Sequence, residues 1–449
     1  MKRFSELSEA FAKTPLFAEK TWRIAAEPWR FSAEKARELE EIGDACLAFY
    51  RASEKLYLAS ASGKNLLRNG KMYAPWVAEI LDRGKPKRFV EHQRSGTLAG
   101  TLPPVIRPDL LVTENGFALT ELDSVPGGIG LTAFLEDCYC GETEIPELFF
   151  DALTDGNAAV RIAVAVSEES ATYRPEFEYL SRRLRQTRNA KIEVCNPNEL
   201  SISGDGVYLA RERIDIVYRF FEMFDWANFP ALEDLMQAAE RGSVRVLPPM
   251  RTFQEEKMSL ALFCNPVLNT FWREALGEKH FSVLKKIVPA SWILEPVENL
   301  PAGACLLAPK PMRDWRELSA LPRRERDYVL KASGFCEDAW GARSVSVGND
   351  CSREEWKNAL EKALEAGHRN SLYILQDFKK PSCENFQIFD DAGTPKNCAV
   401  RARICPYYFV RKNREISFGG ALATLCPADK KIIHGMSSAA LAPCIMQTK

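Results

Sequence analysis

The sequence predicts a mixed α/β (α+β) protein with mixed and antiparallel sheets, a mainly helical N-terminal region and a small α/β lobe. Helical spacing dominates the first hundred residues, a charged hairpin follows at about 105–123, and from Val160 onward buried strands alternate with helical segments. The chain has 449 residues, of which 46% are hydrophobic and 27% are charged. It is therefore long enough to bury a large core spread over two to four lobes.

Residues 1–100 are expected to form a helical support. Ser32 can cap a helix that carries Glu34 in its first turn. Apolar residues then recur at helical spacing: Leu39, Ile42, Cys46 and Phe49. A long amphipathic helix of this kind packs one face against the rest of the protein.

The stretch RPDLLVTENGFALTELDS reads as two strands joined by a tight turn. If 114–116 form a three-residue loop with a left-handed glycine, Asp109 lies opposite Glu121 and Arg107 lies opposite Asp123. All four side chains then share one face, because side chains alternate along a strand. The other face would pack on a core: Ile106, Leu110, Val112, Ala118 and Leu122. A two-residue Asn-Gly loop would instead shift the register by one residue and divide the carboxylates between the faces.

The three carboxylates of this hairpin are candidate metal ligands. Carboxylates that converge raise one another's pKa unless a cation lies among them, and Mg²⁺ prefers such hard oxygen ligands. Asp109, Glu121 and Asp123 are therefore the expected magnesium residues. The alternative is an ordinary solvated hairpin in which Arg107 pairs with Asp123 and Asp109 faces water.

A turn containing Gly127, Gly128 and Gly130 leads from the hairpin into a helix. These glycines lack the GxGxxG spacing, so they are weak evidence for phosphate binding. The pattern then predicts a small α/β substrate-binding lobe at 155–245, with strands in VRIAVAVS, AKIEVCN and RIDIVYRFF. Arg219 and Glu222 would lie at a strand end, where such lobes bind small molecules. Alternatively, Arg219 braces a nearby carboxylate.

Two lysines in the last two hundred residues are candidate phosphate ligands. Lys257 begins a helix, and Lys331 ends a strand before a loop that contains Gly334 and Gly341. A lysine beside a glycine-bearing loop can clamp phosphate, because backbone N–H groups approach the oxygens and the ammonium supplies charge. The alternative is a solvated lysine, and the loop has no Walker form.

A lid is expected at about 325–380. Ser352 and Glu355 form a capping box for the helix SREEWKNALEKALEAG, and a buried strand then breaks at Gln376. The order strand, glycine loop, strand, helix, strand predicts a small antiparallel sheet backed by a helix. Together with 101–154, residues 246–449 would form the catalytic region.

The order of these motifs resembles the circularly permuted ATP-grasp ligases, and within them the glutathionylspermidine synthase type. The shared features are RxD, then ExD twelve positions on, a lysine on a helix, a strand lysine before a glycine-rich loop, and YxLQ. The resemblance covers most of residues 100–449. It implies an ATP-grasp-like fold.

The resemblance also implies roles for individual residues. Asp109, Glu121 and Asp123 would hold two Mg²⁺ ions, and Arg107 would face the transferred phosphoryl group. Lys257 and Lys331 would contact the ATP phosphates. The remaining nucleotide-binding positions are the loop glycines Gly334 and Gly341 and the backbone at Gln376, Asp377 and Phe378, which would meet the adenine.

Two positions depart from the family. Asp123 stands where the family usually has Asn, which adds one negative charge that would either tighten metal binding or alter which metal pair is used. The family also places an arginine after a GG turn, where this chain reads FGGALATLCPADKK. Arg401 or Arg403 would supply the late positive charge instead, and Arg403 is the expected catalytic arginine.

The expected function is that of an ATP-dependent, ADP-forming ligase joining a carboxylate to an amine through an acyl phosphate. Preorganised charges of the kind expected here each stabilise a transition state by about 3 to 4 kcal/mol. Two other functions remain open: a non-catalytic ATP-binding scaffold or regulatory protein, and a phosphotransferase without ligation. The sequence identifies neither the acid nor the amine, nor the oligomeric state.

Composition narrows the partners and the location. The net charge of -1 balances 60 basic against 61 acidic residues, so no overall field favours nucleic acid or a membrane. The sequence has no apolar signal core and no run of about eighteen apolar residues, which predicts a cytoplasmic protein. Its 13 cysteines and 4 histidines show no zinc or catalytic spacing.

Overall fold

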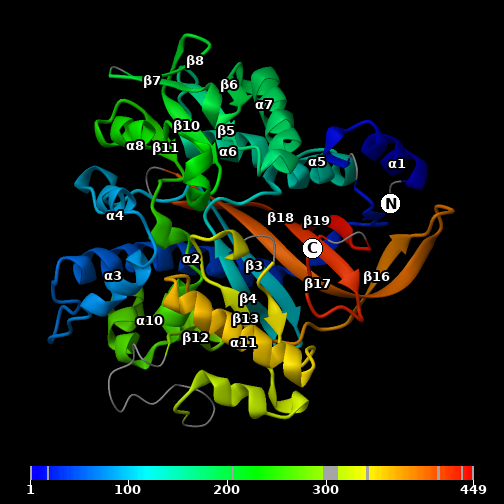
Figure 1. Cartoon of the computed structure of the whole chain (residues 1–449). Coiled ribbons are helices and arrows are strands. Elements are labelled where there is room, and N and C mark those ends of the chain that lie inside the picture. The colour runs from blue at the N-terminus through cyan, green and yellow to red at the C-terminus, as the bar shows by residue number, and fades with distance from the viewer. Residues whose placement is uncertain are drawn as a thin grey trace.

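A computed structural model describes residues 3–17, 20–204, 206–296, 312–339, 343–411, 415–435 and 438–446. Its centre is an eight-stranded sheet in the order β1-β19-β18-β17-β3-β4, with β16 paired to β17 and β2 paired to β19 (Figure 1). The strands of this sheet are β1 (Arg23–Ile24), β2 (Trp29–Phe31), β3 (Val105–Thr113), β4 (Gly116–Asp123), β16 (Glu384–Phe389), β17 (Pro395–Val410), β18 (Ile416–Pro427) and β19 (Ala440–Met446). Most pairs are antiparallel, but β1 and β2 each run parallel to β19.

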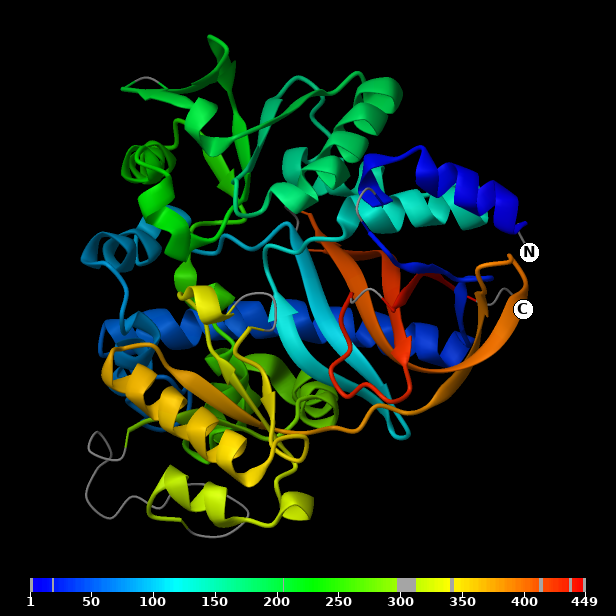
Figure 2. The same ribbon diagram turned by 45° about the vertical axis from the view of Figure 1, so that its right-hand side comes forward.

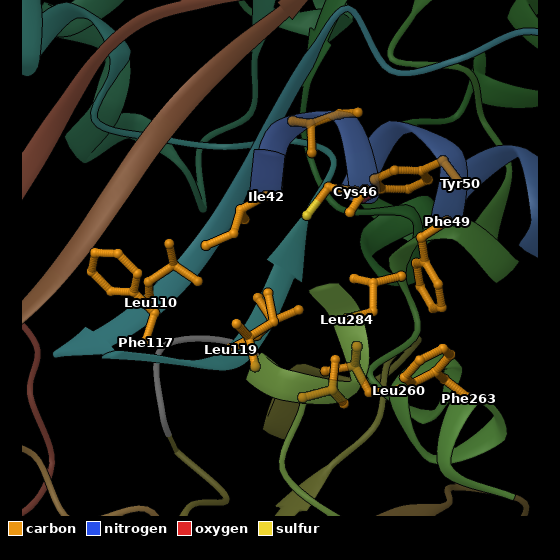
Figure 3. Packing of buried hydrophobic residues seen from close by; sticks show 14 of the residues in the cluster. Ile42, Cys46, Phe49, Tyr50, Leu110, Phe117, Leu119, Leu260, Phe263 and Leu284 are labelled. Atoms are coloured by element: carbon orange, nitrogen blue, oxygen red, sulfur yellow. The ribbon is translucent and has the colours of Figure 1, made fainter. Parts of the chain in front are cut away.

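The long helix α2 (Ala33–Ala61) supports this sheet, as Figure 2 shows. The Ser32 hydroxyl accepts a hydrogen bond from the Lys35 N–H, which confirms the predicted cap. Figure 3 shows Ile42 and Cys46 of α2 facing Leu110 and Leu119 of the β3–β4 hairpin. The helices α3 (Pro75–Asp82), α9 (Met258–Cys264) and α10 (Asn269–Ile287) contribute to the same core cluster as α2 and the hairpin. In contrast, α1 (Phe4–Ala12) packs in the cluster of α5 and α7, and Phe89 of α4 (Lys87–Gln93) packs in a third cluster. The helices behind the hairpin therefore come from two separate parts of the sequence.

A second sheet of four parallel strands, in the order β11-β10-β5-β6, lies apart from the central sheet, at the top of the view in Figure 1. Its strands are β5 (Arg161–Val166), β6 (Lys191–Cys195), β10 (Ile216–Phe220) and β11 (Arg245–Leu247), and its helices are α5 (Ile129–Cys140), α6 (Ile145–Thr154), α7 (Arg174–Arg188) and α8 (Leu232–Glu240). Ile162 and Val164 pack toward α7, whereas Ala163 and Val217 pack toward α8. Both faces are covered, as parallel sheets require.

The predicted strand RIDIVYRFF is divided in the structure. Its first part, β9 (Glu212–Ile214), joins a small antiparallel sheet with β7 (Ser201–Ser203) and β8 (Gly206–Leu209), and only β10 joins the parallel sheet. The chain changes sheets at Asp215, whose N–H bonds to the Arg161 carbonyl and whose carboxylate accepts the Arg161 N–H. The predicted strand is therefore divided because its two parts pair with strands of two different sheets.

A fourth sheet contains the segment predicted as a lid, and the role of that segment as a lid stays a prediction. The sheet is antiparallel, in the order β12-β15-β13-β14, and its edge strand at Ser291–Leu294 lies outside the predicted bounds of about 325–380. Its strands are β12 (Ser291–Leu294), β13 (Tyr328–Ala332), β14 (Ser346–Val347) and β15 (Tyr373–Asp377), and its backing helix is α11 (Arg353–His368). Ser352 and Glu355 form the expected capping box of α11. Trp356 and Leu360 of this helix pack on Leu330 and Leu375 of the sheet.

The predicted fold class is therefore correct: a mixed α/β protein with mixed and antiparallel sheets. The boundaries proposed between the helical support, the catalytic region and the substrate lobe stay a prediction.

Candidate active site

The turn of the β3–β4 hairpin differs from both loops considered from the sequence. Thr113 pairs with Gly116, so only Glu114 and Asn115 form the loop, and the predicted three-residue loop is wrong. Gly116 has a φ of +116°, a value that favours glycine, and its carbonyl accepts the Thr113 hydroxyl at 3.0 Å. This turn alone would place Asp109 opposite Thr120.

A β-bulge corrects the register. Leu110 pairs with Leu119, but Asp109 pairs with Glu121, so Thr120 is the extra residue. The predicted pairs Asp109–Glu121 and Arg107–Asp123 are thereby confirmed. The predicted inner face is wrong near the turn, where Phe117 and Leu119, rather than Ala118, join the core cluster. Ala118 lies outside that cluster because the shorter loop reverses the faces of the residues before the bulge.

Asp109 lies between two arginines. Its carboxylate is 2.9 Å from Arg107 Nε and 2.9 Å from Arg403 Nη1, and it also accepts the Cys405 thiol. Only 3% of Asp109 is exposed. Burial alone would raise the pKa of Asp109, but the two guanidinium groups outweigh it and hold this pKa below its usual range. The solvated-hairpin alternative is therefore wrong in that Asp109 does not face water, although its second element, the ion pair between Arg107 and Asp123, is present.

The other two carboxylates face the open side of the hairpin. Asp123 is 3.0 Å from Arg107 Nη2, and Glu121 is 2.8 Å from Lys257 Nζ. Burial raises the pKa of Asp123, with Glu121 adding to the shift, while Arg107 opposes it. The side chains of Glu121 and Asp123 keep 37% and 28% exposure, so their oxygens remain accessible to a ligand.

The bulge also positions Lys331. Its ammonium donates to the Thr120 carbonyl at 2.6 Å and to the Gln376 side-chain oxygen at 2.9 Å. Lys331 is buried, and the loss of solvent lowers its pKa to about 8. Lys257 precedes α9 as predicted, and its ammonium also donates to the Ala339 carbonyl at 3.0 Å. Both lysines therefore point toward the hairpin rather than into bulk water.

A cavity of about 550 Å³ joins these groups. The predicted residues that line it are Arg107, Asp109, Glu121, Asp123, Lys257, Lys331, Gly334, Gln376, Asp377, Phe378 and Arg403. Gly341 lies outside the described residues. Of the two late arginines, Arg403 reaches the cavity, whereas Arg401 donates to the Lys430 carbonyl. The geometry therefore favours Arg403.

A second acidic group also lines the cavity. Glu222, which follows β10, and Glu255, in a short 3-10 helix (Thr252–Glu255), both line the cavity. Burial raises the pKa of Glu222 to about 8, and neighbouring Glu255 and Asp123 add to this shift. Arg219 is fully buried and pairs with Glu255, so the bracing alternative for this arginine is correct. The sequence reasoning missed Glu255, because no motif marks it.

The glycine turn before α5 forms another end of the cavity. Gly127 and Gly128 line it together with Glu176, a residue in the first turn of α7 that sequence reasoning did not identify. The Gly127 carbonyl accepts Arg107 Nη1 at 3.0 Å and the Tyr407 hydroxyl at 2.9 Å. This turn therefore belongs to the same site as the hairpin.

Within the residues that the structure describes, no three His, Cys, Asp or Glu side chains are grouped closely enough to hold a metal ion by themselves. Both oxygens of Asp109 accept hydrogen bonds from arginine, and Glu121 and Asp123 are the more accessible donors. The magnesium set Asp109, Glu121 and Asp123 stays a prediction. Among the described helices, none combines the length and apolar character that crossing a membrane requires.

Structural comparison identifies the fold. No protein-family model and no curated protein matches the sequence. A glutathione synthetase-like effector from Globodera pallida is similar over 99% of this chain and 97% of its own, with a TM-score of 0.55 and 12% identity. A candidate γ-glutamylcysteine synthetase from Methylobacillus flagellatus aligns over 79% of this chain and 84% of its own, with a TM-score of 0.43 and 13% identity. The chain thus has the fold of a glutathione synthetase-like protein, as expected from its ATP-grasp-like motif order.

Proposed function

We propose that this protein is an ATP-dependent, ADP-forming ligase that joins a carboxylate to an amine through an acyl phosphate, with Mg²⁺. One observation carries the proposal: a single cavity gathers Lys257 and Lys331 against the carboxylates and arginines of a hairpin far away in sequence. Lys331 follows Thr120, its contact on the hairpin, by 211 residues. The fold alone supports a nucleotide site, and the charged residues support the chemistry.

The charges suit transfer of the γ-phosphoryl group to a carboxylate. Such a transfer depends mainly on alignment and on neutralising the charge of the phosphate oxygens. Lys257, Lys331 and Arg107 would contact these oxygens from different sides of the cavity. Asp109 would act by holding Arg107 and Arg403, to both of which it is paired.

Glu121 and Asp123 fit a magnesium ion, because their carboxylates are hard oxygen donors that remain partly exposed on the cavity side. Asp109 would join them only if one of its oxygens left an arginine. Mg²⁺ supplies charge neutralisation at phosphate oxygens when it is bound. The protein's own part is to hold the two carboxylates on one strand.

The lid sheet would cover the nucleotide. Lys331 on β13 and Gln376 on β15 are neighbours in this sheet, and the adjoining backbone at Asp377 and Phe378 lines the same cavity. The adenine would lie against this segment. Closure of the lid would exclude water, which otherwise hydrolyses an acyl phosphate.

The second acidic group suits the amine. Glu222 and Glu255 line the cavity. Because the pKa of Glu222 is raised to about 8 and Glu255 is paired with Arg219, their oxygens would serve mainly as hydrogen-bond acceptors for the amine. An amine that arrives as an ammonium ion would first lose a proton to solvent. The neutral nitrogen would then attack the acyl carbon, displace phosphate and lose a second proton as the amide bond forms.

Labelled oxygen tests this proposal directly. A panel of acids carrying ¹⁸O in the carboxylate is incubated with Mg·ATP and a panel of amines, and the released phosphate is analysed by mass spectrometry. An acyl-phosphate route transfers one labelled oxygen from the acid to the phosphate. The variant K331M should lose ADP release, whereas K362M, on the exposed side of α11, should retain it.

Three results would contradict the proposal. Tight ATP binding without ADP release across the panel would indicate a scaffold. A stable phosphorylated hydroxyl product would indicate a phosphotransferase. Unlabelled phosphate accompanying amide formation would exclude the acyl phosphate.

A further inference from the structure

Glu176 occupies the end of the cavity where two helices begin. It lies in the first turn of α7 and points to the start of α5. Its carboxylate accepts the Leu131 N–H at 3.4 Å and also receives the backbone N–H groups of Gly128 and Gly130. Glu176 is 6% exposed, yet it lines the cavity.

These contacts determine whether the end of the cavity beside Glu176 binds a positively or a negatively charged ligand group. The first N–H groups of a helix have no partner within the helix, and the helix dipole favours an anion near them. Glu176 takes that place for α5. Burial raises the pKa of Glu176 to about 7 although the three N–H groups oppose this, so an ammonium group placed beside it would favour the ionised carboxylate. A ligand carboxylate or phosphate at the same point would meet a like charge, whereas a cationic group would find an acceptor.

Arg107 is the neighbouring charge. Its guanidinium contacts the Gly127 carbonyl, and the next residue, Gly128, donates to Glu176. A positive and a negative side chain therefore flank two consecutive glycines. A ligand that spans them needs a carboxylate and an ammonium only a few atoms apart.

We propose that Glu176 determines the specificity of the acid substrate by binding its ammonium group, while the reacting carboxylate lies toward Arg107. This inference rests on the proposed ligase function and narrows it: the acid is an amino acid, or a molecule ending in one. An acid with a second carboxylate in place of the ammonium is rejected.

Calorimetry separates this inference from catalysis. Amino acids, their N-acetyl derivatives and the corresponding dicarboxylic acids are titrated into the protein with Mg²⁺ and a non-hydrolysable ATP analogue. The amino acid whose side chain the site prefers should bind at least about tenfold more tightly than its own N-acetyl derivative or the corresponding dicarboxylic acid. The reason is that hydrogen bonds to a charged group contribute about 1.5 to 3 kcal/mol.

The variant E176Q tests the residue itself. Gln keeps an oxygen that can accept the helix N–H groups but removes the charge, so the preference for the ammonium should fall to about threefold or less. The control E178Q makes the same change on the exposed face of α7 and should keep the full preference. A merely structural cap would leave the ratio of affinities unchanged in E176Q.

The outcomes are distinct. Equal binding of free and acetylated amino acids to the wild-type protein overturns the assignment of Glu176, even if E176Q does not fold. Selective binding without ADP release would keep the Glu176 assignment and contradict the ligase function. ADP release with acids that lack an ammonium group would contradict the Glu176 assignment and keep the ligase function.

Discussion

Replacing Asp109 by Asn should destabilise the protein even when no metal is present. The substitution keeps the shape of the side chain but removes the charge that lies between Arg107 and Arg403. Arg107 retains its second partner, Asp123. Among the described residues, Arg403 forms an ion pair with Asp109 alone, and its Nε is buried without a hydrogen bond.

The expected cost follows from this burial. Breaking a buried ion pair by removing one partner commonly costs about 3 to 5 kcal/mol, because the remaining charge is left uncompensated. Asp109 is 3% exposed, so solvent screens this loss little. We therefore expect D109N to lose about 3 to 5 kcal/mol of unfolding free energy. A pair on the surface, such as Arg316 with Asp314, should contribute about 1 kcal/mol or less.

Urea denaturation in EDTA measures the effect, with D314N as the matched surface control. In the double variant D109N/R403M the second change removes the uncompensated guanidinium, so the combined loss should be about 1 to 3 kcal/mol smaller than the sum of the single losses. A loss below about 1 kcal/mol for D109N, or simple additivity with R403M, would refute the reasoning.

Three further perturbations test other parts of the structure. Because burial lowers the pKa of Lys331 to about 8, its ammonium is present below that pH and is lost above it, so ATP affinity should fall as pH rises through about 8. Fluorescence titration should show no such fall in K331M. The variant G130A should lose about 1 to 3 kcal/mol, because a Cβ there would lie 2.3 Å from the Glu176 carbonyl oxygen; G96A, where nothing lies within 4 Å, is the control for thermal melting. The variant S352A should lose about 1 kcal/mol through its cap, and S352T should restore most of it; equal melting temperatures would contradict the capping role.

Short sequence patterns correctly predicted those elements that are stabilised by interactions between residues close together in the sequence. The cap at Ser32, the capping box at Ser352 and the lid strands follow from residues close together in sequence. The pairing of Asp109 with Glu121 was also predicted, although by a loop that does not exist. Two departures, a shorter turn and the bulge at Thr120, offset one another.

The bulge could not be predicted from the sequence of the hairpin, because the residue that contacts it is distant in the chain. An ordinary ladder would engage the Thr120 carbonyl, whereas the bulge leaves it to accept Lys331, which comes from another sheet. Glu176 and Glu255 were missed for the same reason. Their neighbours at the cavity come from other helices and strands, and neither residue stands in a motif.

The position of β17 sets the order in which this site can be completed during synthesis. One neighbour of β3 in the sheet is β4, the next strand in the sequence. Its other neighbour is β17, which comes much later in the chain. Arg403 follows Asp109 by 294 residues, which corresponds to roughly 15 to 60 s of translation at about 5 to 20 residues per second. Until β17 emerges, Asp109 lacks one arginine and β3 presents an open edge, which can pair with another chain. A chain that ends before Arg403 would therefore keep this edge open and be more prone to aggregate than the full-length protein.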